Sequence, residues 1–238
     1  EAGGAGGTFS DLAAVLRIAG RHCAPIPLAE TAIAGWMLAS SGLKIPAGPL
    51  TLAPVHGEKI TARKSGANWR LAGALTRVPY ARVANHIAIL AAGPAGNVIA
   101  RVGAVQCKIT PGRNFAHEPR DGVMLDDIEI AADQVAPAGA GVTHAALKER
   151  GALARALMMA GALEHALELS VRYTTERSQF GRKIGQFQAI QQELARFAGE
   201  VAAAVASALS AAGAVERGGN ATLAVASAKI RTAQAAQE

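Results

Sequence analysis

Aromatic residues and cysteines are both scarce in this sequence of 238 residues. Phe, Trp and Tyr make up 4% of the chain whereas hydrophobic residues make up 50%, so the core must be built mainly from Ala, Leu, Val and Ile. Small side chains of this kind let helices approach one another closely. Cys23 and Cys107 are too few and too far apart to form a disulfide framework, which indicates a reducing compartment.

The sequence also lacks the spacings of a metal site and the marks of a membrane or secreted protein. Its six His and two Cys residues form no His-x3-His or Cys-x2-Cys pair, so the sequence predicts no metal site. No apolar run approaches the roughly 18–20 residues of a membrane span, and the first residues lack the charged-then-apolar order of a signal peptide. We therefore expect a soluble, cytoplasmic protein with no membrane span.

The charge is basic but dispersed. The chain has 24 Lys and Arg residues against 18 Asp and Glu residues, which gives a formal net charge of +6 and an isoelectric point near 9.7. This balance favours anionic partners, which include nucleic acid, anionic lipid and phosphate-bearing cofactors such as FAD and coenzyme A. No block of five or six adjacent basic residues occurs, and aromatics are not interleaved with the basic residues, so nucleic acid is the weaker choice.

Residues 1–45 are expected to form a glycine-rich loop followed by two helices. The opening EAGGAGG lacks the Gly-x-Gly-x-x-Gly order of a phosphate-binding loop and no strand precedes it, so we interpret it as a loop. Thr8 or Ser10 could cap the first helix. That helix carries Leu12, Val15, Leu16 and Ile18 on one side. The second helix is expected from Leu28 to about Leu43.

Residues 46–137 change to short runs bounded by Gly, Pro, Asn and Asp, which is typical of strands joined by turns. Seven strands at this spacing predict a small β-barrel or sandwich. The expected strands are Leu50–Val55, Lys59–Lys64, Trp69–Ala74, His86–Ala92, Asn97–Val102, Val105–Ile109 and Gly122–Ile130.

Residues 138–238 are predicted to form an antiparallel helical bundle. Two series of apolar residues recur at spacings of three or four, and each gives one stripe on a helix. The series are Leu153, Leu157, Ala160, Leu163, Leu167, Val171 and Phe187, Ile190, Leu194, Phe197, Val201, Val205. A break at Gly218 and Gly219 precedes a third helix from about Ala221 to Gln237. The chain is thus expected to be an α+β multidomain protein, with N-terminal helices in 1–45, a middle β-domain in 46–137 and a C-terminal bundle in 138–238.

A basic, glycine-containing elbow joins the first two bundle helices, where residues 172–191 read RYTTERSQFGRKIGQFQAIQ. Arg177 offers a planar fork of donors that matches phosphate oxygens, and Gly181 and Gly185 let the backbone come close to a ligand. Gln179 and Gln188 can both donate and accept hydrogen bonds. An apolar wall of the kind that covers a ring system is formed by Phe180, Ile184, Phe187 and Ile190. The combination suits a dinucleotide; the alternative is an ordinary helix corner with solvated arginines and buried phenylalanines.

This elbow resembles the signature of the acyl-CoA dehydrogenases, an Arg-x-x-Phe-Gly turn followed by an apolar residue and a Phe-Gln pair, here Phe187 and Gln188. The resemblance implies FAD-dependent desaturation of an acyl-CoA thioester, in which a carboxylate takes the α-proton while the β-hydride leaves to the flavin. It also implies electron-transfer flavoprotein as a partner, and a homodimer or homotetramer, with a hetero-oligomer as a further possibility.

The same resemblance assigns the elbow residues to the flavin of a neighbouring subunit. Arg177 would bind the pyrophosphate. Gln179 and Phe180 would lie at the turn. The residues placed along the flavin or adenosine would be Ile184, Phe187, Gln188 and Ile190.

Other segments extend the resemblance over nearly all of the chain. The opening Glu-x-x-Gly-Gly and residues 24–30 resemble the end of the family's N-terminal helical domain, and residues 68–92 and 118–121 resemble its β-domain. Two segments depart from the family. Residues 50–55 stand where a Thr-Glu-x-x-x-Gly-Ser segment usually holds the flavin, and residues 78–80 replace a usual Trp-Ile-Thr/Ser contact. Side chains of this domain are therefore not expected to bind flavin in the usual way, although backbone groups still can.

The resemblance leaves the catalytic base unassigned. In most members the base follows a later Gly-rich segment, beyond Glu238, so we expect residues 1–238 to represent part of an enzyme without its base. In other members a Glu begins the first bundle helix, where Gly151 falls here and Glu149 lies two residues earlier. Two rival functions stay open. One is a non-catalytic partner subunit that completes another chain's flavin site, and the other is a basic helical scaffold that binds no nucleotide.

Overall fold

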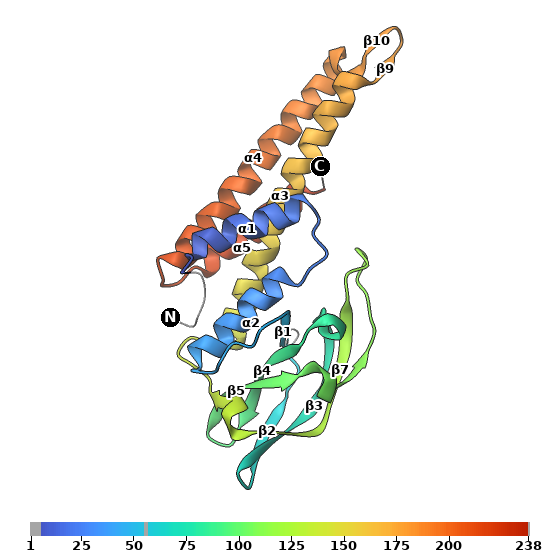
Figure 1. The fold of residues 1–238 in the computed structure, drawn as a ribbon. Coiled ribbons are helices and arrows are strands. Elements are labelled where there is room, and N and C mark those ends of the chain that lie inside the picture. Colours follow the sequence, from blue (N-terminus) through green and yellow to red (C-terminus); the bar gives the residue numbers. More distant parts are fainter. Residues whose placement is uncertain (1–5, 55–56, 238) are drawn as a thin grey trace. The chain divides into compact units, whose positions relative to one another are not determined.

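The computed structural model describes residues 6–54 and 57–237, and the chain divides into two compact units (Figure 1). The first unit contains residues 25–151. The second unit joins residues 6–24 to residues 152–237, so the first helix of the chain belongs with the last ones. Helix α3 (His144–Glu176) begins in the first unit and continues into the second. Helices and a β-sheet occur together, which confirms the expected α+β architecture.

The first unit is built on one sheet of eight strands and the helix α2 (Leu28–Ser40). The strands are β1 (Leu50–Ala53), β2 (Thr61–Ser65), β3 (Asn68–Pro79), β4 (His86–Gly93), β5 (Gly96–Gly103), β6 (Lys108–Thr110), β7 (Arg120–Ile130) and β8 (Val135–Pro137). They pair in the order β6-β7-β3-β2-β4-β5-β8, and β1 lies parallel to β4. Helix α2 packs against β1, β4 and β5. The Thr31 hydroxyl ties α2 to β1 because it accepts from Leu50 N at 3.0 Å and donates to Leu50 O at 3.1 Å.

Several strands differ from the expected ones: β2 begins at Thr61 rather than Lys59, and β3 continues to Pro79 rather than ending at Ala74. Val105 lies in a short 3-10 helix, Ala104–Gln106, and is fully solvent-exposed, so β6 begins only at Lys108. Strand β8 was not expected because three residues ending in Pro137 carry no alternating pattern, yet they pair with β5. Val55, the end of the first expected strand, lies outside the described residues.

The first helix of the second unit, α1 (Phe9–Arg21), is capped by Thr8 rather than by Ser10. Thr8 Oγ1 accepts from Asp11 N at 3.1 Å, and the Asp11 carboxylate accepts from Thr8 N at 2.7 Å, which makes a capping box. Ser10 instead donates its backbone N–H to Glu216 Oε1 at 3.3 Å and its hydroxyl to the same carboxylate. The start of α1 is therefore tied to the end of α4 (Gln188–Glu216).

Two glycines let α1 lie directly on α3. A Cβ added at Gly20 would lie 2.0 Å from the carbonyl oxygen of Met158, and one at Gly161 would lie 1.9 Å from that of Arg17, so no larger residue fits at either place. Arg17 pairs with Glu164 at 2.6 Å, although the two residues are 147 positions apart in the chain. These contacts explain why α1 belongs to the second unit.

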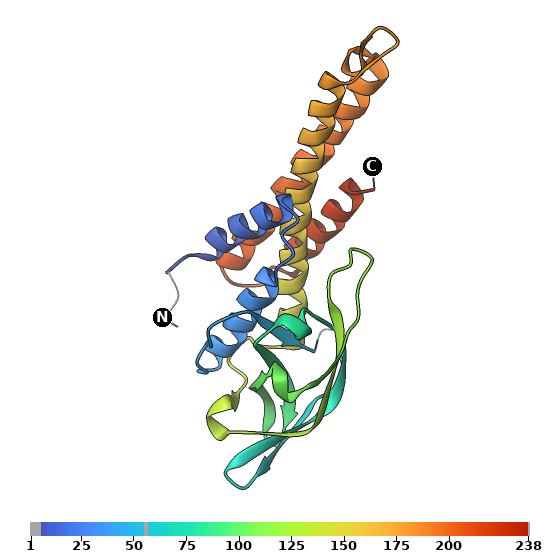
Figure 2. The ribbon, with the colours of Figure 1, turned by 45° about the vertical axis from the view of Figure 1, so that its right-hand side comes forward.

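Small side chains also join α4 to α5 (Thr222–Ala235), as the shortage of aromatics indicates. The buried residues of the two helices are Val201, Ala204, Ala208, Ala211 and Ala212 on α4, and Val225, Ala228, Thr232 and Ala235 on α5. Arg231 and Glu200 form an ion pair across the helices. In both ribbon views, α4 runs beside α3 up to the hairpin of β9 (Ser178–Gln179) and β10 (Arg182–Lys183) (Figures 1 and 2).

Helix α4 contains an 18-residue window with a mean hydropathy of 1.5, so by length and composition it could cross a membrane. The helix is not an uninterrupted apolar run, because it contains Glu193, Arg196 and Glu200. Within the second unit α4 packs against α1 and α5, as a helix of a bundle does. Its composition alone is therefore weak support for a membrane span.

Candidate functional site

The elbow between α3 and α4 is a short β-hairpin with a two-residue turn, followed by a single 3-10 turn. Arg182 pairs with Gln179 and Lys183 with Ser178, which leaves Phe180 and Gly181 at the tip. Both tip residues have positive φ angles, +52° and +80°, the pattern of a type I′ hairpin turn. Glycine adopts this conformation freely, whereas Phe180 is one of the few other residues of the described chain in the left-handed region.

The hairpin is closed against the helices by backbone contacts. Ile184 N donates to Arg177 O at 3.0 Å, which joins the end of α3 to the 3-10 turn Ile184–Gln186. Gly185 lies against the last turn of α3, where an added Cβ would approach Thr174 O to 3.1 Å. Phe187 N donates to Ile184 O at 3.1 Å before α4 begins at Gln188. The elbow therefore has a defined shape that depends on its glycines.

Two arginines of the elbow keep their charge unpaired. The Arg177 guanidinium carbon lies 5.9 Å from the ring centre of Tyr173, and that of Arg182 lies 4.1 Å from the ring centre of Phe187. Among residues 6–54 and 57–237, no carboxylate forms an ion pair with either arginine. Their N–H donors are thus available to an external anion, and a guanidinium matches the oxygens of a phosphate in a bidentate way.

Aromatic rings lie next to these donors. Phe180 is 92% exposed, and its ring meets that of the half-buried Phe187 edge to face, with the centroids 6.2 Å apart. Exposed aromatic surface beside unpaired guanidinium groups suits a ligand that carries both a planar ring and a phosphate.

The structure brings most of the residues chosen from the sequence to this elbow. Gln179 and Phe180 lie in the hairpin, and Ile184 begins the 3-10 turn. Arg177 links α3 to β9, and Phe187 links the 3-10 turn to α4. Gln188 begins α4 and is exposed.

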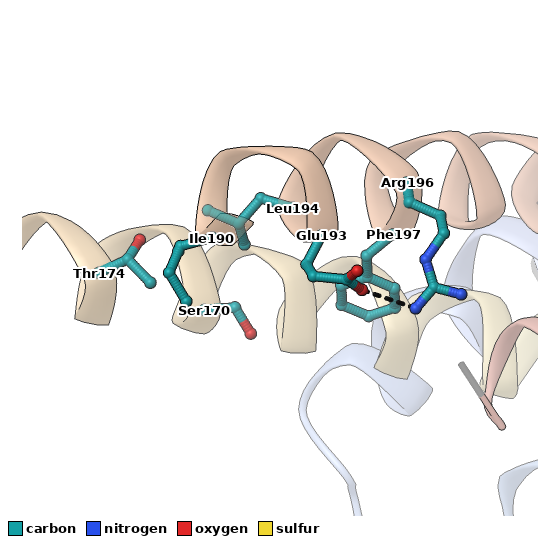
Figure 3. A pocket seen from close by; sticks show the side chains of 7 residues that line it. All are labelled: Ser170, Thr174, Ile190, Glu193, Leu194, Arg196 and Phe197. Carbon is teal, nitrogen blue, oxygen red and sulfur yellow. Dashed lines mark hydrogen bonds and ion pairs between the residues drawn. The ribbon is translucent and has the colours of Figure 1, made fainter. Parts of the chain in front are cut away.

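Ile190 is placed differently from the other chosen residues. Its side chain lies in an open groove of about 360 Å³ between α3 and α4 (Figure 3). The groove is lined by Ser170, Thr174, Ile190, Glu193, Leu194, Arg196 and Phe197. Ile190 belongs to the same helical stripe as Leu194 and Phe197, so the helix directs all three toward α3 rather than toward the hairpin tip.

Four further residues shape the elbow and were not chosen from the sequence. Tyr173 and Arg182 stack with the residues described above. Lys183 Nζ donates to Glu176 O at 2.7 Å, and Gln191 Nε2 donates to Gly185 O at 3.0 Å. The basic character of Arg182 and Lys183 was visible in the sequence, but their directions depend on the reversal of the chain at Gly181.

The first unit offers little of its own to a flavin at the segment where the family usually binds it. Strand β1 is buried along its whole length, and Thr51 is 0% exposed. The Thr51 hydroxyl donates to Pro79 O at 2.6 Å, so it is already used within the unit. The donors of the elbow fit a dinucleotide, whereas the side chains of β1 do not.

Glu149, the carboxylate considered as a base, lies half-buried near the start of α3. The neighbouring Arg150 stacks on Trp36, with its guanidinium carbon 3.8 Å from the ring centre. Burial lowers the pKa of the Arg150 guanidinium, and the Glu149 carboxylate opposes that shift. Arg150 thus has a packing role in the first unit.

Comparisons with known proteins agree with these features. Residues 138–238 match the family described as acyl-CoA dehydrogenase, C-terminal domain. Acyl-CoA dehydrogenase IpdE2 of Mycolicibacterium smegmatis is 30% identical over 204 residues, which cover 86% of this chain and 57% of the relative. The chain therefore spans little more than half the length of this curated relative.

Two solved structures share the fold. The crystal structure of the ChsE4-ChsE5 complex from Mycobacterium tuberculosis matches 99% of this chain and 69% of its own, with a TM-score of 0.83 and 25% identity. A glutaryl-CoA dehydrogenase from Mycobacterium smegmatis in complex with FADH2 matches 76% of this chain and 48% of its own, with a TM-score of 0.66 and 18% identity.

Proposed function

The chain belongs to the acyl-CoA dehydrogenase family, and on this premise we propose that it serves in the FAD-dependent α,β-desaturation of an acyl-CoA thioester. The observation that carries the proposal is the pair of guanidinium groups of Arg177 and Arg182, which form no ion pair in the described part of the chain and lie in the elbow beside aromatic rings. A phosphate-bearing dinucleotide would satisfy both features at once.

The proposal gives the elbow residues binding roles rather than chemical ones. Arg177 would hold the pyrophosphate of the flavin, and Gln179 and Phe180 would contact it at the turn. Ile184, Phe187 and Gln188 would line its ring systems or its adenosine, and Ile190 would do so from the groove between α3 and α4. When bound, FAD would supply the hydride acceptor for the β-hydrogen of the thioester.

A second candidate is favoured by a specific observation in the first unit. Because β1 is buried and the Thr51 hydroxyl is bonded to Pro79 O, the side chains of this strand offer no free donor to a flavin. The elbow could nevertheless complete the flavin site of another chain. The ChsE4-ChsE5 structure is a complex of two named chains, which supports such a partnership.

The proposed assembly has several members. An elbow that completes a neighbour's site requires at least a dimer, so we propose a homodimer, a homotetramer or a hetero-oligomer. Electron-transfer flavoprotein is the proposed acceptor of the electrons, acyl-CoA the proposed substrate and the cytoplasm the proposed compartment.

The absorbance spectrum of the purified full-length protein tests the proposal. A flavin spectrum from the protein alone would support an enzyme that holds its own cofactor. A flavin spectrum that appears only after a second chain is added would support the partner subunit. A colourless protein that takes up no FAD, alone or with a family partner, would overturn both in favour of a scaffold that binds no nucleotide.

A further inference from the structure

Two polar side chains of the elbow bind the protein's own carbonyl groups. Lys183 Nζ donates to Glu176 O at 2.7 Å, and Gln191 Nε2 donates to Gly185 O at 3.0 Å. One residue lies on β10 and the other in the first turn of α4. The first contact therefore joins the hairpin to α3, and the second joins the 3-10 turn to α4.

The contact of Lys183 caps the C-terminal end of helix α3 and orients the hairpin that follows. Glu176 is the last residue of α3, and the last carbonyls of a helix lack partners within the helix and carry partial negative charge. A lysine ammonium satisfies one such carbonyl and interacts favourably with the helix dipole. Lys183 also pairs with Ser178 across the hairpin. Its contact with Glu176 O therefore fixes the position of the hairpin relative to the end of α3.

The contact of Gln191 holds the 3-10 turn. Gln191 reaches back six positions to Gly185, which already lies against Thr174 O at the end of α3. Ile184 N adds a hydrogen bond of 3.0 Å to Arg177 O. The turn is therefore held between the last turn of α3 and the first turn of α4.

Three of the cations in the elbow, Lys183, Arg177 and Arg182, differ in what they face. Lys183 is bound to a backbone carbonyl, whereas Arg177 and Arg182 lie over aromatic rings, without an ion pair in the part of the chain that the structure describes. This division separates a group that shapes the elbow from two groups that can receive a ligand.

We propose that Lys183 and Gln191 are positioning residues that hold Arg177 and Arg182 in place for a dinucleotide before it binds. The inference rests on the proposed function, because it takes the flavin pyrophosphate as the ligand of the elbow. A site that is ordered in advance loses less conformational entropy on binding, so its affinity is higher for the same contacts.

The first measurement is hydrogen exchange in the flavin-free full-length protein. Lys183→Met and Gln191→Ala each remove one donor from an exposed position, so both variants should fold. We expect the amides of Ile184 and Phe187 to exchange at least about 3-fold faster in both variants. The matched controls are Gln192→Ala, which changes the adjacent exposed glutamine, and Lys183→Arg, which keeps a charged donor. Both should leave the exchange rates unchanged, and unchanged rates in the two test variants would overturn the inference.

The second measurement is the dissociation constant for FAD in the assembled protein. We expect Lys183→Met and Gln191→Ala to weaken binding by about 3- to 10-fold each, and Lys183→Arg to restore it. Weaker binding without faster exchange would make Lys183 a direct ligand contact and would contradict the positioning role. If Arg177→Ala weakens binding while both test variants bind normally, the inference fails and the proposed function stands. If Arg177→Ala binds FAD normally, the proposed function fails, and the exchange rates still decide whether the two residues hold the elbow.

Discussion

Arg82 in the first unit and Arg177 in the second show two opposite uses of the same side chain. Arg82 binds Asp121, which is 0% exposed: its Nε donates to Oδ1 at 2.9 Å, and its Nη2 reaches both Oδ1 and Gly112 O. Arg177 faces solvent beside Tyr173, with no ion pair among the described residues. A guanidinium with a buried internal partner holds the fold, whereas one without an ion pair at the start of a hairpin can bind a ligand.

The largest expected effect comes from Arg82→Ala. The change leaves the Asp121 carboxylate buried with only the backbone donors Arg82 N, at 2.9 Å, and Gly112 N, at 3.1 Å. Loss of one partner of a buried pair costs about 3 kcal/mol in the free energy of unfolding, near the lower end of the usual range because the two backbone donors stay in place. Urea denaturation of the variant and the parent protein measures the difference.

The pH dependence of stability tests whether the buried Asp121 charge causes the effect of Arg82→Ala. Burial raises the pKa of Asp121, but its hydrogen bonds with Arg82 and Gly112 outweigh burial and hold the pKa below its ordinary value of 3.8. The folded state is therefore stabilised at pH values above about 4, and this contribution is lost as the pH falls through the lowered pKa. Asp121→Asn should abolish that loss, and the double variant Arg82→Ala/Asp121→Asn should be more stable than Arg82→Ala. A double variant that is no more stable would mean that the buried charge is not the cause.

Arg177→Ala should have the opposite effect, with weaker FAD binding and almost unchanged stability. If Arg177 binds the flavin pyrophosphate, the change removes charge-assisted hydrogen bonds worth about 1.5–3 kcal/mol and weakens FAD binding roughly 10- to 150-fold. The free energy of unfolding without flavin should change by about 0.5 kcal/mol or less, because the side chain is exposed. FAD titration and urea denaturation of the same preparations separate the two quantities. Arg177→Lys restores the charge but not the planar fork, so it should recover only part of the affinity.

Gly161→Ala tests whether the second unit, like the first, depends on a contact inside its own core. The added Cβ would meet the Arg17 carbonyl oxygen at 1.9 Å, which α1 and α3 can relieve only by moving apart. We expect a loss of about 1–3 kcal/mol in the free energy of unfolding. Gly199→Ala is the matched control, because Gly199 lies in α4 with nothing within 4 Å of the added atom and alanine favours helix. Equal stability of the two variants would contradict the close approach of α1 to α3.

Local sequence patterns predicted the helices and strands better than they predicted which of them pack or pair together. The sequence offered Thr8 or Ser10 as the cap of α1, and the structure has Thr8, because a cap depends on residues close together in the chain. The grouping of α1 with α3 was not visible, since Gly20 and Gly161 meet residues that lie far away in the chain. Strand β8 was missed for a similar reason: its three residues become a strand only through pairing with β5.

In the candidate site, too, the sequence predicted local features but not the contacts that depend on the fold. The ordered motif around Arg177 and Phe180 indicated the elbow, because turn chemistry and donor type are local properties. The contacts of Lys183 and Gln191 depend on how the chain reverses at Gly181 and then passes Thr174 at Gly185. The direction of a side chain after two such reversals is a property of the folded backbone, so the sequence could not show which cation binds a backbone carbonyl.

The smallest effect on stability is expected for Arg63→Ala. Arg63 has an ion-pair partner but lies at the surface. Arg63 Nη2 donates to both carboxylate oxygens of Asp127, at 2.8 and 2.9 Å, yet its side chain is 62% exposed. Exposed pairs of this kind contribute little because water screens the charges and two side chains must be ordered. Asp127 also keeps the hydrogen bond from Arg70 Nη1 at 2.7 Å. We therefore expect no measurable change in the urea midpoint, in low or high salt. A loss as large as that of Arg82→Ala would show that pairing matters more than burial, and Arg82 and Arg177 would then differ only in having or lacking a carboxylate nearby.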